Sequence, residues 1–127
     1  MRYLFPVLSL VVSTSVHAGA LNDCYDRVDT RPAVSQCLSQ RLDTAQQEHT
    51  ALASAALNEA RSLDGVTDGR HRAVQRFQQA ESAFNQYRQD FCSYTQALLA
   101  SGNGAEQAAL ACLIDLTEAH TQRLRNR

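Results

Sequence analysis

The chain lacks most of the features that would indicate chemistry. It has no lysine, no C-x-x-C pair, and no G-x-S-x-G, P-loop or H-E-x-x-H motif in its 127 residues. The common signatures of serine hydrolysis, nucleotide binding, zinc proteolysis, thiol redox chemistry and c-type haem attachment are therefore missing. After position 20, no run approaches the roughly 18 uninterrupted apolar residues that a membrane-spanning helix needs. We expect neither an enzyme of a recognisable class nor a membrane-spanning chain.

The first residues have the composition of a secretory signal peptide. A single cation precedes an uncharged apolar stretch over residues 3–12, and small residues then lead to Ala18. The sequence predicts a signal peptidase cut after Ala18, although a cut after Ala20 is also acceptable. We therefore expect residues 1–18 to be a signal peptide and residues 19–127 to form a single exported domain, periplasmic or secreted.

Cysteine usage agrees with export. Cys24, Cys37, Cys92 and Cys112 all follow the predicted cut, and an even number of cysteines in an exported chain indicates two disulfides. Asp23 directly precedes Cys24, and a charged residue at that position does not suit lipid attachment. The mature chain is therefore expected to be free of a lipid anchor.

The charge balance gives no sign of a nucleic-acid partner. The whole chain has 12 basic and 13 acidic side chains, so removal of Arg2 with the signal leaves 11 against 13, a net charge of −2. Domains that bind nucleic acid usually carry a basic patch and a positive net charge. We expect a protein partner instead.

Candidate ligands and catalytic groups are dispersed along the mature chain. His49, His71 and His120 are the histidines that remain after cleavage, and none has a second histidine four residues away. Glu81 and Asp90 are expected on a solvated helix face, with no sign of a paired acid and base. The sequence therefore predicts no catalytic residue, no cofactor and no metal site.

Apolar spacing predicts three helices, and hence an all-α fold. The first extends over about 30–63, with Thr30 as its cap and a stop at 64–65. The second extends over about 70–100. The third follows a glycine-containing turn and extends over about 103–124. We expect an antiparallel three-helix bundle, or hairpin, held by two disulfides.

The second helix carries a row of apolar side chains spaced by three and four residues. Such a row usually packs in the core of a helical bundle. We therefore expect it to face the other two helices. Its members are Phe77, Ala80, Phe84, Tyr87, Phe91, Tyr94 and Leu98.

The turn also indicates how the cysteines pair. Cys92 and Cys112 are each ten residues from Gly102, so they stand at the same height in an antiparallel helical hairpin. Cys24 then pairs with Cys37 by exclusion. Asn103, with Glu106 three residues later, is similar to a capping box at the start of the third helix.

Several of these positions have the spacing of a known family. Tyr-Arg follows an aromatic residue by three, a cysteine follows the tyrosine by five, and a glycine turn precedes a cysteine that has threonine five residues later. The pattern resembles the lysozyme inhibitor LprI family. It is carried here by Phe84, Tyr87, Arg88, Cys92, Gly102, Cys112, Thr117 and Leu124.

Three positions depart from the family pattern. Phe84 replaces a usual tryptophan, His120 a common arginine, and Ala33 a glutamate. The motif residues have structural interpretations as well. Tyr87 is expected in the core, Arg88 in an ion pair or backbone contact, and Thr117 in a cap or bond within the third helix.

The resemblance implies an exported helical protein, and two hypotheses for its function follow. The first is an inhibitor that binds a lysozyme and occludes its cleft; the second is a non-inhibitory structural or adaptor domain of the bacterial envelope. For contact with a partner, the candidates are Ser101, Gly102, Asn103 and Gly104 in the second turn. The connection at 64–69 is the weaker candidate. Arginines at the C-terminus are expected only to complement the dipole of the last helix.

Overall fold

The computed structural model describes residues 19–100, 102 and 104–127, and within them it contains four α-helices and no strand. The prediction of an all-α fold is confirmed. Three long helices lie close to their predicted positions, and a short helix, α1, precedes them. The helices are α1 (Ala20–Arg27), α2 (Arg31–Val66), α3 (Ala73–Leu98) and α4 (Ala105–Arg125).

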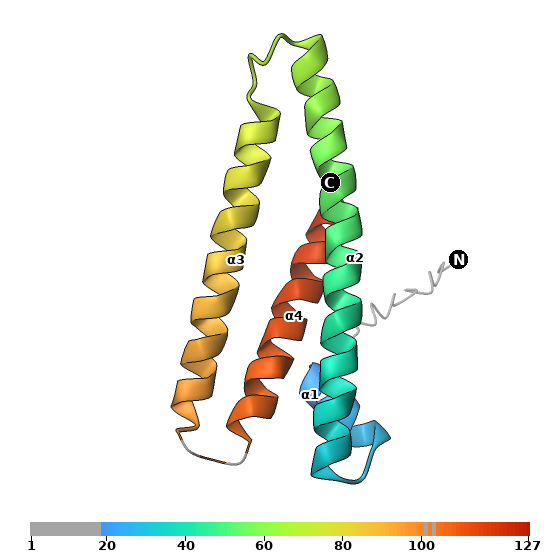
Figure 1. The fold of residues 1–127 in the computed structure, drawn as a ribbon, viewed down its shortest axis with the longest axis vertical. Coiled ribbons are helices and arrows are strands. Elements are labelled where there is room, and N and C mark those ends of the chain that lie inside the picture. The colour runs from blue at the N-terminus through green and yellow to red at the C-terminus, as the bar shows by residue number, and fades with distance from the viewer. Residues whose placement is uncertain (1–18, 101, 103) are drawn as a thin grey trace, which may run out of the picture.

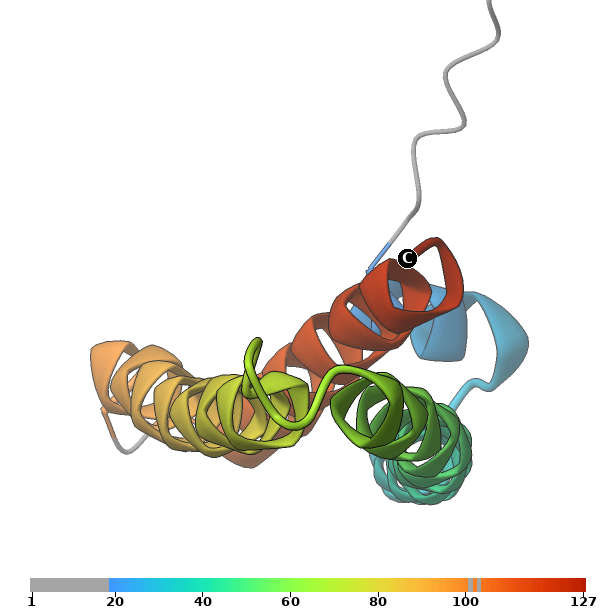
Figure 2. The same ribbon diagram turned by 90° about the horizontal axis from the view of Figure 1, so that it is seen from above.

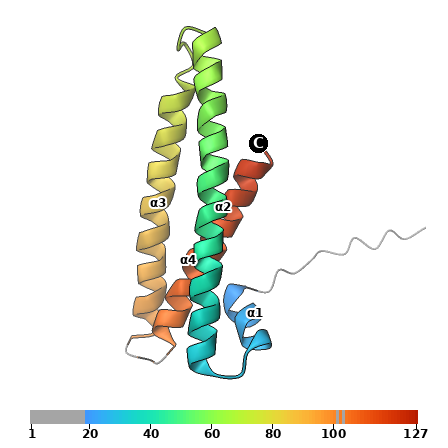
Figure 3. The same ribbon diagram turned by 45° about the vertical axis from the view of Figure 1, so that its right-hand side comes forward.

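The long helices form an antiparallel hairpin crossed by a third helix. α2 and α3 approach each other toward the connection that joins them and are splayed at their other ends (Figure 1). α4 lies across the splayed part and contacts both (Figure 2). α1 lies beside the first turns of α2 and the outer side of α4 (Figure 3).

The start of α2 is as predicted, but its end is not. The hydroxyl of Thr30 accepts a hydrogen bond from the backbone amide of Ala33 at 3.4 Å. The helix does not stop at 64–65 and continues to Val66. The side chain of Asp64 instead caps the next helix. Its carboxylate accepts hydrogen bonds from two backbone amides in the first turn of α3.

The fully buried core lies between α1, α2 and α4, near the splayed end of the hairpin. Its larger side chains are Val34, Leu38 and Ile114, and alanines and a cysteine supply the rest. Its members are Ala20, Cys24, Val34, Leu38, Ala111 and Ile114.

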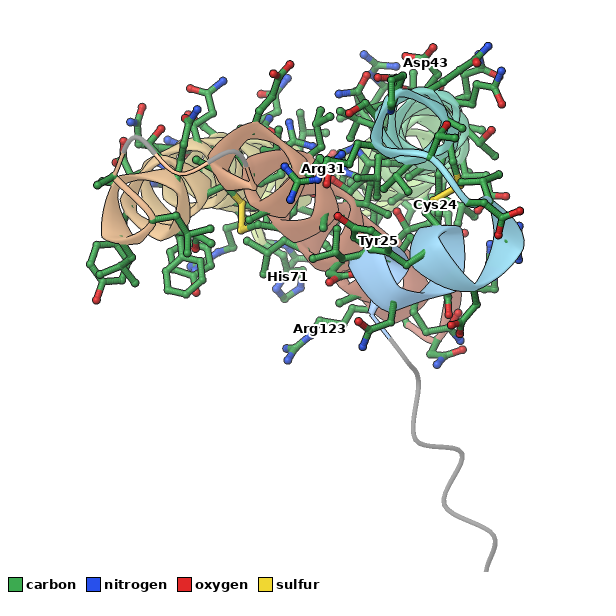
Figure 4. The ribbon with its side chains drawn as sticks, turned by 90° about the horizontal axis from the view of Figure 1, so that it is seen from below. Cys24, Tyr25, Arg31, Asp43, His71 and Arg123 are labelled. Carbon is green, nitrogen blue, oxygen red and sulfur yellow. A yellow bond between two sulfur atoms is a disulfide. The ribbon has the colours of Figure 1, made fainter. Side chains whose placement is uncertain are left out.

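Both predicted disulfides are confirmed. Cys24 and Cys37 join α1 to α2, with their Cα atoms 5.9 Å apart, and Cys92 and Cys112 join α3 to α4, with theirs 5.5 Å apart. Figure 4 shows the sulfur atoms at Cys24 between the first two helices. Both covalent links therefore lie in the splayed half of the molecule.

A buried amide anchors α1 beside the Cys24 disulfide. Gln107 of α4 accepts a hydrogen bond from the hydroxyl of Tyr25 at 2.8 Å and donates to the backbone oxygen of Arg31 at 3.1 Å. The labelled Tyr25 and Arg31 lie close together in Figure 4, where the three helices meet. Asp43 points away from the bundle in the same view. The short helix is thus fixed to both of its neighbours.

The prediction that the aromatic row of α3 is core is wrong for most of its members. Tyr87, Phe91, Tyr94 and Leu98 are exposed, and only Phe77 and Phe84 are half-buried. The helix is rotated so that Cys92 faces Cys112, which places Arg88, Phe84 and Glu81, four, eight and eleven positions before Cys92, on the inner face. The neighbouring row at 87–98 is consequently turned outward. Ala80 is exposed as well.

Candidate functional site

The inner face of α3 is polar as well as aromatic. Arg88 donates a hydrogen bond through Nη1 to the hydroxyl of Thr117 at 2.8 Å, and this hydroxyl donates in turn to the backbone oxygen of Leu113 at 2.6 Å. The guanidinium carbon of Arg88 lies 5.6 Å from the ring centroid of Phe84, within the range of a cation–π contact. Arg88 therefore connects α3 to α4 through a fully buried threonine.

One turn before Phe84 on α3, Glu81 lies between two histidines. Oε2 of Glu81 is 2.8 Å from Nε2 of His49, and Oε1 is 2.5 Å from Nε2 of His120. The ring of His120 stacks on Phe84, with centroids 3.8 Å apart and planes inclined by 16°. This group draws on α2, α3 and α4.

The expectation that Glu81 faces solvent is wrong, whereas Asp90 is exposed as expected. No local pattern predicts the histidine pair, because His49 and His120 lie on different helices and are far apart in the sequence. Glu81 and Phe84 are three residues apart on one helix face, but that spacing is common. Only the packing of three helices brings the group together.

A second charged group joins α1, α2 and α4. Arg41 of α2 contacts Asp23 of α1 at 2.5 Å, and its Nε and Nη2 donate to the two oxygens of Glu118 on α4 at 2.8 and 3.0 Å. The hydrogen bonds that Arg41 donates to Glu118 and Asp23 hold its pKa above its ordinary value. Such a forked pair with a carboxylate is specific to the planar guanidinium.

The outer face of α3 presents large apolar side chains to solvent. The rings of Tyr87 and Phe91 have centroids 5.5 Å apart, and those of Phe91 and Tyr94 are 6.1 Å apart. Together with Leu98, these residues form a surface that we call the aromatic face. Between 41% and 65% of each member is exposed. Contiguous apolar surface of this kind is typical of interaction sites.

The aromatic face ends at the turn between α3 and α4. Gly102 and Gly104, two of the predicted contact residues, are exposed there. The other two, Ser101 and Asn103, lie outside the described residues. The predicted cap at Asn103 is wrong, because α4 begins at Ala105 with Gly104 at its N-cap and no side-chain cap. The Cys92–Cys112 disulfide joins α3 to α4 next to Phe91, in the middle of the face.

Comparison with known families identifies the chain. A family model described as lysozyme inhibitor LprI matches residues 22–124. The chain belongs to the LprI family. No curated protein and no solved structure gave a match. The LprI match includes both disulfides, the inner face of α3 and the aromatic face, so the resemblance carried by the Tyr-Arg and cysteine spacing is confirmed.

The LprI motif residues divide between the interior and the surface. Phe84, Arg88 and Thr117 lie on facing sides of α3 and α4 and contact one another or His120. Tyr87 was expected in the core but is 53% exposed. Adjacent residues of a helix point about 100° apart, so the Tyr-Arg pair necessarily faces two directions.

The C-terminal arginines of this LprI chain also have specific partners. Arg127 donates to both carboxylate oxygens of Glu59 on α2, at 2.7 and 2.9 Å, and Arg125 lies 3.9 Å from Glu48. The expectation that these arginines only complement the helix dipole was therefore too narrow. They attach the end of α4 to the middle of α2.

Proposed function

We propose that the mature chain inhibits a lysozyme by binding it and covering its glycan cleft. Membership of the LprI family supports this activity, and the observation that carries the location is the aromatic face of α3. On this proposal, the chain acts by occlusion and supplies no catalytic group. The aromatic face and the adjoining turn form the contact surface.

The composition of the aromatic face suits a binding site. Tyrosine and phenylalanine are enriched at protein interfaces, and tyrosine is among the residues that contribute most of the binding free energy. The two tyrosines also present hydroxyls, which can pair with polar groups in a carbohydrate cleft. A retaining or inverting glycosidase has two carboxyl groups flanking the scissile bond, and hydroxyl donors are complementary to them.

The support beneath the aromatic face keeps it rigid. α3 is joined to α4 by the Cys92–Cys112 disulfide and by the Arg88–Thr117 hydrogen bond, both on the opposite side of the helix. A surface that is already ordered loses little conformational entropy on binding. The family motif would therefore serve the interaction indirectly, by holding α3 in one rotation.

The size of the surface sets a further requirement. A stable interface usually needs about 800 Å² from each partner, which is more than four side chains provide. The exposed Leu99 and the glycines of the turn extend the aromatic face in one direction. The small negative net charge would assist the approach to a cationic lysozyme only weakly, and salt would reduce that attraction.

We further propose that the protein acts outside the cytoplasm, in the periplasm or after secretion. Two disulfides require an oxidising compartment, and residues 1–18 have the composition of a signal peptide. In the part of the chain that the structure describes, no helix is long and apolar enough to cross a membrane.

The test is a turbidity assay of cell-wall lysis by c-, g- and i-type lysozymes, with the mature disulfide-bonded protein in excess. We expect at least one lysozyme to be slowed at micromolar inhibitor. If none is slowed and calorimetry detects no binding, the inhibitor proposal is wrong and the alternative, a structural or adaptor domain of the envelope, replaces it.

Matched variants locate the surface. Leu98 and Leu63 are both exposed leucines, 65% and 45%, but Leu63 lies on α2 near the other end of the hairpin. We expect Tyr94→Ala and Leu98→Ala to weaken inhibition about tenfold or more each, which is the scale of an interface hot spot. Leu63→Ala should leave inhibition unchanged. Inhibition that survives both substitutions on α3 would show that another surface binds.

A further inference from the structure

The group formed by His49, Glu81 and His120 has the donor atoms of a metal site. One ligand atom from each residue lies within 4.8 Å of the other two. Two imidazole nitrogens and one carboxylate oxygen are ligands that zinc and related first-row ions prefer, whereas magnesium and calcium prefer oxygen alone. We propose that these three side chains bind a divalent transition-metal ion, with zinc as the best fit.

The distances are close to those that a tetrahedral ion requires. Two ligand atoms each about 2.05 Å from zinc, at a tetrahedral angle, are about 3.3 Å apart. The two nitrogen–oxygen distances, which end on different oxygens of Glu81, are 2.8 and 2.5 Å, so each must lengthen by less than 1 Å, and the three ligand atoms lie within 4.8 Å of one another. Three protein ligands leave a fourth position for water.

The hydrogen bonding of His49 also favours an ion. Its Nε2 is buried and lies 2.8 Å from Glu81, but it is not aligned for a hydrogen bond and has no such partner among the described residues. A buried polar atom without a partner costs free energy. An ion placed between the imidazole and the carboxylate would accept the lone pair of this nitrogen.

The surroundings would hold the ligands in place while leaving an entry path. The stacked ring of Phe84 restricts His120, and the ring of His49 lies 5.9 Å from the same phenyl group. The three ligand side chains are 12% to 18% exposed. They are therefore shielded from most of the solvent but accessible to a hydrated ion.

The position indicates what the ion would do. His49 is on α2, Glu81 on α3 and His120 on α4, so a bound ion would join the three long helices at a level where neither disulfide acts. The expectation of no metal site rested on the spacing of histidines along the sequence. A site assembled from three helices has no such spacing.

The proposal is tested first on the unsubstituted mature protein, stripped with a chelator and titrated with zinc chloride in a calorimeter. We expect one ion per chain and a dissociation constant in the micromolar range or tighter. Long-range proton–nitrogen NMR spectra should show shifts of the His49 and His120 imidazole nitrogens on zinc addition. His71, which is exposed and apart from the group, should not shift. Absence of binding, or zinc-dependent shifts at His71 alone, would overturn the proposal.

Paired histidine substitutions provide the second test. His120→Gln should weaken zinc binding by more than about 100-fold, which exceeds the usual cost of losing an outer-shell partner. His71→Gln is the matched control and should bind zinc like the parent protein. Circular dichroism checks that both variants are folded, and the NMR result stands whether or not His120→Gln folds. Equal zinc affinity of a folded His120→Gln and the parent would contradict the assignment.

Discussion

The backbone amide of Ala20 donates a 2.9 Å hydrogen bond to Oδ1 of Asp115, which attaches the first helix to the last. Ala20 is fully buried, and a Cβ atom built on Gly19 would lie 3.1 Å from the other oxygen of Asp115. A cut after Ala18 would therefore create a new α-ammonium group close to this carboxylate. A cut after Ala20 would instead remove a core residue.

The first prediction is that the exported protein begins at Gly19. This end would keep Ala20 buried and place the new α-ammonium group near Asp115, whereas an end at Leu21 would lose both. Intact mass spectrometry of protein recovered from the periplasm of an expression host measures the terminus. A mature chain that begins at Leu21 would show that the Ala20–Asp115 contact is dispensable.

The second prediction compares two phenylalanines of α3. Phe84→Ala should lower the free energy of unfolding by about 2 to 3 kcal/mol, somewhat less than the 3 to 5 kcal/mol of a fully buried ring, because Phe84 is half-buried. Phe91→Ala should cost less than about 1 kcal/mol, since Phe91 is 41% exposed. Urea denaturation measures both. Equal losses would mean that the outer row is packed in solution.

The third prediction concerns Arg41. Arg41→Ala should cost about 1 to 2 kcal/mol, because it removes charge-assisted hydrogen bonds to Asp23 and Glu118 that are only partly exposed. Arg41→Lys should recover less than half of this, since an ammonium group cannot reproduce the two parallel bonds to Glu118. Thermal unfolding ranks the three proteins. A lysine variant as stable as the parent would show that charge alone matters here.

The fourth prediction concerns pH. Hydrogen bonds from the amides of Val74 and Ala73 hold the pKa of Asp64 below its ordinary value, and the nearby His71 adds to this effect. A lowered pKa in the folded state means that the stabilisation is complete above the unfolded value of about 3.9 and is lost as pH falls through the folded value. Asp64→Asn should therefore lower the melting temperature at neutral pH.

The difference between Asp64→Asn and the parent should disappear in acid. Asp68→Asn is the control, because Asp68 is an exposed carboxylate in the same connection and has a positive φ of 52° that asparagine tolerates. It should not change the melting temperature at neutral pH. A difference for Asp64→Asn that persists unchanged at low pH would contradict the capping role.

The sequence predicts the helices well because their signals are local. The apolar periodicity, the Thr30 cap and the glycines of the connections identify three of the four helices. The equal distances of Cys92 and Cys112 from Gly102 identify the hairpin disulfide, as the structure confirms. α1 is short and has only two buried residues, so its apolar pattern is too brief to recognise.

The rotation of α3 could not be predicted from its most apolar row. The prediction that this row packs in the core assumes that large apolar side chains are buried. Cys92 carried a better signal, because a disulfide fixes which face meets α4, and Phe84 and Arg88 lie on that face. The contacts of His49 and His120 with Glu81 depend on the packing of three helices, and no spacing along the chain predicts them.

Both disulfides lie in the splayed half of the molecule, and α4 ends where Arg127 meets Glu59 of α2. Beyond that level, among the residues that the structure describes, the last turns of α2 and the first turns of α3 pack only on each other (Figure 1). Their amide protons should therefore exchange with deuterium through local fraying, at rates insensitive to the global stability. Amides of α2 beside Cys37 should exchange only when the whole domain opens. The LprI domain would thus be most stable at the end that carries the aromatic face.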